Sequence, residues 1–121
     1  MTTTTFIEEA IKQNTIYLLI NKDDEFAQLE SEQTEQQDWT PCMIQFLFSN
    51  ESSCTKLTNL LFTDYHPIAL PISEVLEYLL AVDEAWWLVM LNPTAEMNQT
   101  EHEPVDIYNA IGEKLWLFEE E

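Results

Sequence analysis

The residue types that most often perform catalysis or bind metals are few in this chain and are not spaced for either task. His66 and His102 are the only two histidines among 121 residues, and neither stands in an HExxH or a related ligand spacing. Cys42 and Cys54 are the only cysteines. A zinc site built from these four residues would require four distant segments to converge, so we expect no metal site.

The single glycine, Gly112, excludes several kinds of active site. Nucleophile elbows, phosphate-binding loops and dinucleotide-binding motifs all need glycines where the backbone approaches a ligand closely. The acidic stretch 21–30 superficially resembles a calcium loop, but it lacks the glycine at the sixth position and acids at regular alternate positions. Asp64 and His66 are the best remaining candidates for a catalytic pair. We therefore predict no catalytic residue, no cofactor and no enzymatic activity.

The net charge of the chain limits the classes of molecule that it can bind. Asp and Glu number 23, against four lysines and no arginine, which gives a formal net charge of -19. Proteins grip phosphates with Lys and Arg, and a surface this negative would repel DNA, RNA and anionic lipid. We therefore expect a protein partner, with a basic protein favoured by charge, and no binding to nucleic acid or membrane.

The lengths of the apolar segments and the number of cysteines indicate in which cellular compartment the protein is located. The longest uninterrupted apolar run, residues 85–91, is far shorter than the roughly 20 residues that a bilayer span requires. Met1 is followed by four threonines, which lack the basic start and apolar stretch of a signal peptide. Two cysteines in apolar surroundings fit buried thiols in a reducing compartment better than a disulfide framework. These features predict a cytoplasmic location.

Four aromatic residues are the candidate interaction residues: Trp86, Trp87, Trp116 and Phe118. Adjacent strand residues point to opposite faces, so Trp86 and Trp87 can both be core residues only if the sheet is covered on both sides. The alternative is that one of them marks an exposed interaction face. The segment 115–118, followed by three glutamates, either completes the core or presents an apolar anchor with an acidic flank.

The periodicity of apolar residues predicts alternating helices and strands. Helices are expected at 6–12, after a cap at Ser49 or Asn50, after a cap at Ser73, and from Pro104 to Gly112. Strands are expected at 15–20, 26–29, 42–48, 65–70 and 85–91, with Asn92 and Pro93 as a stop signal.

This pattern predicts one domain over residues 1–121 of the α/β (α+β) class. We expect a single mixed β-sheet of about five strands with three to four helices packed against it. The acidic segment near 30–40 is expected to form a mobile loop, and 119–121 an acidic C-terminal tail.

Three stretches carry a resemblance to a known family: Phe46–Glu51, Ala85–Pro93 and Glu103–Ile107. They resemble the N-terminal domain of the bacterial enhanced serine sensitivity B (SseB) type proteins over roughly residues 10–112. In that family a strand leads through a short turn into a helix, and a later strand leads into an Asn-Pro-Gly turn. Thr94 replaces the expected glycine, and the C-terminal domain of longer relatives is missing. The resemblance implies a compact cytoplasmic α/β module with no catalytic residues to carry over.

The leading hypothesis from the sequence is a non-enzymatic protein-interaction or regulatory module of the bacterial cytoplasm. The alternative is an acidic inhibitor of a basic target, either an immunity protein for a toxin nuclease or a mimic of DNA phosphates, because complementary charge speeds such association. A homodimer formed through a strand edge or the segment 115–118 is also open, although the net charge of -19 opposes self-association at low salt.

Overall fold

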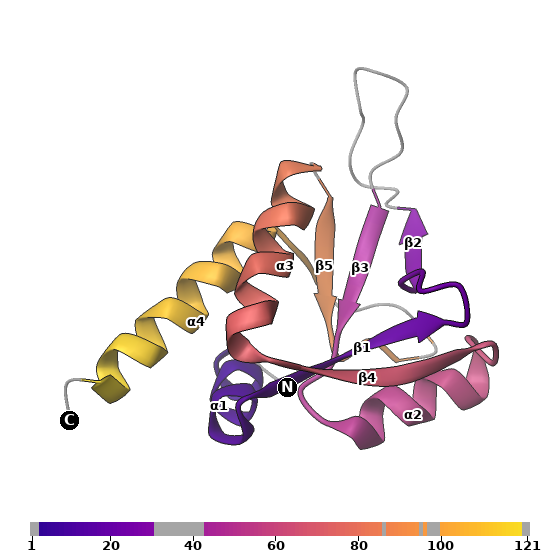
Figure 1. Ribbon diagram of the computed structural model, residues 1–121, viewed down its shortest axis with the longest axis horizontal. Coiled ribbons are helices and arrows are strands. Elements are labelled where there is room, and N and C mark those ends of the chain that lie inside the picture. The colour runs from indigo at the N-terminus through magenta and orange to yellow at the C-terminus, as the bar shows by residue number, and fades with distance from the viewer. Residues whose placement is uncertain (1–2, 31–42, 86, 95, 97–99, 120–121) are drawn as a thin grey trace.

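The computed structural model describes residues 3–30, 43–85, 87–94, 96 and 100–119 (Figure 1). Within these ranges the chain forms four helices and six strands, which confirms the predicted α/β (α+β) class. In chain order they are α1 (Thr3–Gln13), β1 (Thr15–Asn21), β2 (Gln28–Glu30), β3 (Met43–Leu47), α2 (Glu51–Leu60), β4 (Tyr65–Pro71), α3 (Ile72–Glu84), β5 (Leu88–Leu91), β6 (Glu101–His102) and α4 (Pro104–Glu119).

The strands form two hydrogen-bonded sheets, so the prediction of one sheet of about five strands is wrong. β1 and β4 form an antiparallel pair, and the second sheet has the order β2-β3-β5-β6, in which β3 and β5 are parallel. Isolated bridges at Tyr17–Phe48 and Ile20–Phe26 join β1 to the larger sheet. Figure 1 shows the reason: β1 and β4 run across the foot of β3 and β5, so β1 meets the larger sheet near the crossing.

The larger sheet is covered on both faces, because successive residues of a strand point to opposite sides. Phe46 and Met90 face α2, where they pack with Cys54 and Leu57 in one buried cluster. Leu47 and Val89 lie in the other cluster, which also takes buried residues from α1, α3 and α4: Phe6, Ile7, Ala10, Ile72, Val75, Leu79, Val82, Ile107 and Ile111. A sheet buried between two layers gives each strand two apolar faces.

Two predicted helix starts have different outcomes. α2 follows β3 after a short turn and is capped by Asn50, one of the two predicted caps, whose Oδ1 accepts the Ser53 amide proton at an N···O distance of 2.8 Å. α3 begins at Ile72 with Pro71 at the N-cap position, so the predicted cap at Ser73 is wrong. The reason is that β4 runs straight into α3, which places Ser73 inside the first turn.

The last helix continues beyond the predicted stop at Gly112. α4 extends to Glu119, and Gly112 lies within it without the positive φ that a helix-ending glycine adopts. Ile111 and Leu115 pack on the same core cluster on either side of the glycine. Tertiary packing of this apolar face therefore outweighs the roughly 1 kcal/mol that a glycine costs inside a helix.

The strand predicted over 85–91 is also shorter than expected. Ala85 is the C-cap of α3, and β5 begins at Leu88. The predicted loop near 30–40 lies outside the described residues beyond Glu30, and the predicted tail lies outside them beyond Glu119. Of the helices in the described ranges, none is both long enough and apolar enough to cross a membrane.

Candidate interaction site

One of the four sequence-predicted interaction residues has a described side chain. Trp87 is half-buried between α3 and β5, and its amide donates to the Val82 carbonyl at an N···O distance of 3.2 Å. Trp86 lies outside the described residues. Trp116 and Phe118 belong to the last turns of α4, but their side chains lie outside the described part of the structure. The structure thus places Trp87 and leaves the other three as predictions.

Trp87 lines a hollow of about 470 Å³, which we call the aromatic groove. Phe26, Tyr65 and Tyr78 supply three further aromatic side chains from the segment before β2, from β4 and from α3. Phe26 and Tyr78 pack edge to face, with ring centroids 5.3 Å apart at an interplanar angle of 61°. This arrangement is favourable for aromatic pairs and holds two walls of the groove together.

The floor of the groove is polar because of Gln45, in the middle of β3. Its side chain is buried, with 2% of its surface exposed. Its Nε2 donates to Gln28 Oε1 at 2.5 Å, and its Oε1 accepts from the Tyr78 hydroxyl at 2.8 Å. An unpaired buried amide costs about 1–3 kcal/mol, so these bonds are what allow a glutamine in an apolar strand. The network fixes β2, β3 and α3 relative to one another.

Burial also sets the chemistry of Tyr78. The loss of solvent raises the pKa of its phenol well above the ordinary value of 10.0. The hydroxyl therefore stays protonated and remains a hydrogen-bond donor to Gln45 at neutral pH. Tyr78 has no feature of a general base, and its role in the groove is structural.

The rim of the groove carries acidic side chains. Asp24 and Glu25 are exposed in the turn between β1 and β2, where Asn21 Oδ1 accepts the amide protons of Asp23 and Glu25, each at an N···O distance of 2.9 Å. Asn21 Nδ2 also donates to Glu25 Oε1 at 3.3 Å. The carboxylates are therefore held by a structured turn beside the aromatic walls.

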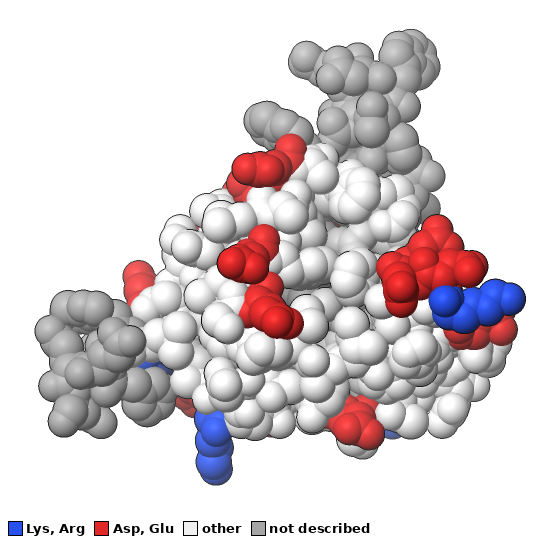
Figure 2. Space-filling view, in the orientation of Figure 1, with Lys and Arg blue, Asp and Glu red and all other residues white. Residues whose placement is uncertain are grey.

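Helix α3 adds negative charge on the other side of the groove. Its sequence has four acidic residues and no basic one. Figure 2 shows the acidic side chains gathered at the turn after β1 and along α3, with uncharged surface between them. Lys22 is the one basic residue of that turn. The two elements that flank the groove are thus both predominantly acidic.

Sequence reasoning found Trp87 but missed its partners in the groove. Gln45 was the one available signal, since it is the only polar residue in the apolar segment 42–48. Phe26, Tyr78 and Asp24 come from segments that the fold alone brings together.

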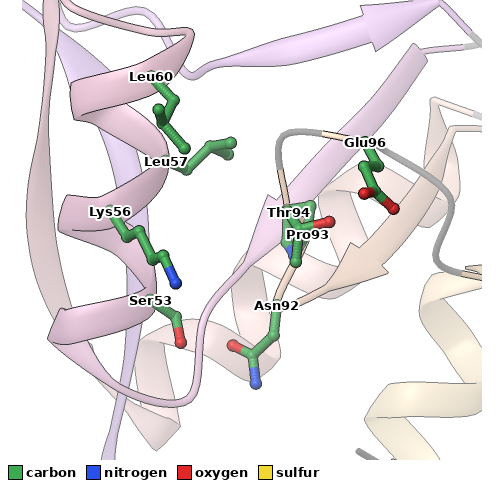
Figure 3. A pocket seen from close by; sticks show the side chains of 8 residues that line it. All are labelled: Ser53, Lys56, Leu57, Leu60, Asn92, Pro93, Thr94 and Glu96. Atoms are coloured by element: carbon green, nitrogen blue, oxygen red, sulfur yellow. The ribbon is translucent and has the colours of Figure 1, made fainter.

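A second hollow of about 410 Å³, the α2 pocket, lies between α2 and the segment after β5 (Figure 3). Ser53, Lys56, Leu57 and Leu60 line it from α2, and Asn92, Pro93, Thr94 and Glu96 line it from the other side. Leu57 is buried, whereas Leu60 has 57% of its surface exposed.

Next to this pocket lies a network of side-chain hydrogen bonds, which we call the joint. Asn92 Oδ1 accepts the Ser49 amide proton, and Asn92 Nδ2 donates to Ser49 Oγ, both at 2.9 Å. Ser49 Oγ in turn donates to Glu9 Oε1 at 2.8 Å, and Asn50 Nδ2 donates to the same oxygen at 3.0 Å. The joint connects α1 with the ends of β3 and β5. Its buried polar atoms are mutually satisfied, which indicates a structural role.

The sequence-level candidates for chemistry lie elsewhere. Asp64 and His66 are exposed around the start of β4 and line neither the aromatic groove nor the α2 pocket. Burial, together with the nearby Glu51 carboxylate, raises the pKa of the Cys54 thiol to about 12, so the reactive thiolate is scarce at neutral pH. Within the described part of the chain, no three His, Cys, Asp or Glu residues are grouped so as to hold a metal ion.

No protein-family model matches the chain, and no curated protein sequence matches it. The similarity to SseB-type proteins therefore stays a prediction from sequence. The stretches that carry it include residues of β3, β5 and α4, and their turn residues are Ser49 and Asn50, between β3 and α2, and Asn92, after β5. The positions of these turn residues are explained by the joint next to the α2 pocket.

Proposed function

We propose that the protein is a non-enzymatic interaction module that binds a basic protein partner through the aromatic groove. The observation that carries this proposal is the meeting of aromatic walls with an acidic rim. Phe26, Tyr78 and Trp87 line the same hollow as Asp24 and Glu25. Each kind of group attracts a cationic side chain in its own way.

Aromatic rings attract ammonium and guanidinium groups through the negative potential of the ring face, by about 0.5–2 kcal/mol depending on desolvation. Carboxylates attract the same groups by charge, and Arg pairs with them in a fixed bidentate geometry. The methylene stems of Lys and Arg can pack on the aromatic walls while the charged head reaches the rim. A hollow of about 470 Å³ is within the size range of binding pockets and can hold such a side chain.

The net charge of -19 supports the same choice of partner at longer range. Complementary charge raises association rates and makes them dependent on ionic strength. The acidic face formed by α3 and the turn after β1 surrounds the groove, so a basic surface would be drawn to the place where its side chains fit.

The alternative, an acidic inhibitor of a basic target, draws on the row of acids along α3. Glu74, Glu77 and Glu84 are exposed on one helix with no basic residue between them. Such a row of carboxylates resembles, in its negative charge, the row of phosphates along a DNA strand. An immunity protein or DNA mimic must also block its target, so loss of nuclease activity or competition with DNA separates this alternative from a plain interaction module.

The proposal is tested by defined cationic peptides and then by natural partners. Hexalysine and hexaarginine are titrated into the protein with two-dimensional NMR, and hexaglutamate serves as the negative control. We expect shifts at Trp87 and Gln45, and binding about tenfold weaker for Trp87→Ala and for the double variant Asp24→Asn/Glu25→Gln. The double variant Glu74→Gln/Glu77→Gln removes the same charge from α3 outside the groove lining and is the matched control.

The same variants are then used in pull-downs from bacterial cytosol. The proposal predicts a basic protein that the wild-type chain and the α3 control variant retain and that the two groove variants lose. It fails if peptide binding weakens equally for all variants, because that result would show attraction by net charge without a site.

A further inference from the structure

Strand β4 has one edge that pairs with β1, and no described strand pairs with its other edge, which we call the outer edge. Figure 1 shows β1 between β4 and the larger sheet, and the isolated bridges of β1 to Phe26 and Phe48 lie on the side of that sheet. An unpaired strand edge can accept an extended segment of another chain through its backbone N–H and C=O groups. The backbone groups on the outer edge of β4 therefore decide what can pair with it.

The hydrogen bonds of β1 show which residues of β4 face the outer edge. The Tyr17 amide donates to the Phe48 carbonyl, and the Leu19 carbonyl accepts from the segment before β2, so both residues direct these groups away from β4. In an antiparallel pair, the backbone groups of two opposite residues either face each other or both face away. Tyr17 lies opposite Ala69, and Leu19 lies opposite Pro67. The backbone groups of Ala69 and Pro67 therefore face the outer edge.

This alternation leaves few donors on the outer edge. Tyr65 also faces outward, since the opposite residue, Asn21, forms its backbone bonds within its own turn. The Tyr65 amide is already bonded to the Phe62 carbonyl at an N···O distance of 3.0 Å, and Pro67 has no amide proton. Between residues 65 and 69, Ala69 thus supplies the one available outward N–H. The outward carbonyls of these three β4 residues accept no hydrogen bond from the described residues.

The prolines are the main protection of this edge. None of the seven residues of β4 is Lys, Arg, Asp or Glu, the side chains that commonly guard an edge strand. Pro67 and Pro71 both lie at positions where an amide proton would point outward, so neither interrupts the bonds to β1. Ala69, between them, is exposed, as are His66 and Pro71. The middle of the outer edge is therefore accessible to another strand.

We propose that the outer edge of β4 binds an extended, proline-free, basic segment of another protein by strand addition. The segment donates to the carbonyls of Tyr65, Pro67 and Ala69 and accepts from the Ala69 amide, which gives four backbone hydrogen bonds. Lys and Arg side chains in the segment are favoured by the net charge of -19 and by Asp64 and Glu74, which are exposed near the two ends of β4.

A second copy of this chain does not suit the outer edge. Each copy brings one available outward N–H, so any register of β4 against β4 forms at most two backbone bonds. At the other positions a carbonyl would face a carbonyl or a proline ring. Pro67 therefore discriminates between partners, because it removes a donor that a second copy needs and that a proline-free segment supplies itself. Repulsion between two chains of charge -19 acts in the same direction.

A peptide of alternating lysine and valine, seven residues long like β4 and capped at both ends, is the probe. Calorimetric titration of the full chain measures its affinity. The control peptide has the same side chains but carries a methyl group on each backbone nitrogen, so it keeps the charge and lacks the backbone donors. We expect the methylated peptide to bind at least about tenfold more weakly. Equal affinities would overturn the proposal, because charge and side chains alone would then explain the binding.

Two substitutions change the number of outward donors in opposite directions. Ala69→Pro removes the available N–H without breaking a bond to β1, and it should weaken peptide binding about tenfold. Pro67→Ala adds an outward N–H and should strengthen binding about fivefold. His66→Ala is the matched control, because it changes an exposed side chain of the same strand and leaves the outward donors as they are. It should leave the affinity unchanged.

Thermal midpoints check that the variants fold, and a loss of stability cannot produce the gain expected for Pro67→Ala. If neither substitution changes the affinity, or if His66→Ala weakens binding as much as Ala69→Pro, the proposal is overturned.

The outer edge is independent of the proposed function, since only the ring of Tyr65 lines the aromatic groove and only its carbonyl belongs to the edge. If Trp87→Ala weakens binding of the lysine–valine peptide and Ala69→Pro does not, the peptide occupies the groove. The edge proposal then fails while the proposed function stands.

Sedimentation in high salt, which screens the repulsion between copies, should show a monomer. A wild-type dimer that Ala69→Pro dissociates would assign the edge to a second copy and overturn the proposal.

Discussion

The aromatic groove and the α2 pocket lie on opposite faces of β3 and differ in their lining. Gln45 points from β3 into the aromatic groove, while its neighbour Phe46 packs on the α2 side. The groove has carboxylates on its rim, whereas both Lys56 and Glu96 line the α2 pocket. Carboxylates of one sign attract a basic partner over a distance, whereas a lining with charges of both signs favours neither sign of partner at long range.

The two hollows are also supported by different hydrogen-bond networks. The groove rests on Gln45 and Tyr78, which join the middle of a strand to a helix. The α2 pocket rests on Ser49 and Asn92, which join the ends of two strands. Substitutions in one network should therefore leave the other hollow intact, and this independence can be tested.

The largest effect is expected from Asn92→Ala. It removes the acceptor of the Ser49 amide, which is buried, and it puts alanine at a backbone φ of 46°, a left-handed conformation that asparagine tolerates better. Together these changes should cost about 2–4 kcal/mol of unfolding free energy. Urea denaturation measures this cost. NMR signals of Gln45 and Tyr78 should keep their positions, so a shift there would break the proposed independence.

Asn92→Gly separates the two causes, because glycine tolerates a positive φ but also lacks the side-chain bonds. It should be about 1 kcal/mol less damaging than Asn92→Ala. Equal losses for the two variants would mean that backbone strain contributes nothing.

A smaller loss, about 1–3 kcal/mol, is expected for Gln45→Leu, because it leaves the buried Tyr78 hydroxyl without its acceptor. Tyr78→Phe removes that hydroxyl, so the double variant should be more stable than the sum of the two single changes predicts. A double-mutant cycle in urea measures the coupling. Simple additivity would contradict the network.

The pH dependence of the unfolding free energy should differ between the α2 side of the larger sheet, which contains Cys54, and the groove side, which contains Tyr78. The pKa of Cys54, on the α2 side, is about 12 in the folded chain against 9.0 as the ordinary value, so the folded state keeps its proton longer. This contribution to stability is complete below pH 9.0 and is lost as the pH rises toward about 12. The raised pKa of Tyr78 acts in the same direction from about pH 10.0 upward.

Unfolding measured from pH 8 to pH 11 should therefore show falling stability, with a slope of up to about 1.4 kcal/mol per pH unit for each group. Cys54→Ala should flatten the first part of the decline, and Tyr78→Phe the later part. A decline that begins at the same pH in both variants would contradict these assignments.

The smallest effect is expected at the ion pair between Lys114 and Glu8, at an N···O distance of 3.3 Å on the surface between α4 and α1. Lys114→Gln should cost less than about 1 kcal/mol, and salt should reduce the difference further. Because neither residue lines the aromatic groove or the α2 pocket, this variant gives the baseline for surface changes. A larger loss would show that contacts between α1 and α4 depend on this pair.

Local features were predicted correctly from the sequence where the residues that determine them lie within a single segment. The apolar segment at β3 and the Asn50 cap were found because each signal lies within a few residues. The helix stop at Gly112 was wrong because the packing of Ile111 and Leu115 on distant residues decided it. The prediction of a single sheet was wrong because a strand that is apolar on both faces has the same sequence pattern whether it lies within a sheet or crosses the end of one.

The site was predicted in part for the same reason. Trp87 was chosen as an aromatic residue within the strand predicted over 85–91, and the structure places it just before β5, in the lining of the aromatic groove. The bond between Gln45 and Gln28 depends on the register of β2 against β3, which pairs these two residues. Register depends on the apolar patterns of both strands and on the connection between them, so neither segment by itself reveals it.

The position of β1 has a consequence for the order in which the protein forms during synthesis. Residues 15–21 leave the ribosome early, but their partner strand, residues 65–71, is made much later. Until then the edge of β1 that pairs with β4 stays open to other chains, since the isolated bridges to Phe26 and Phe48 do not supply that partner strand. Truncated chains that end before residue 71 should therefore aggregate. A chaperone that binds the open edge of β1 during translation should reduce this aggregation.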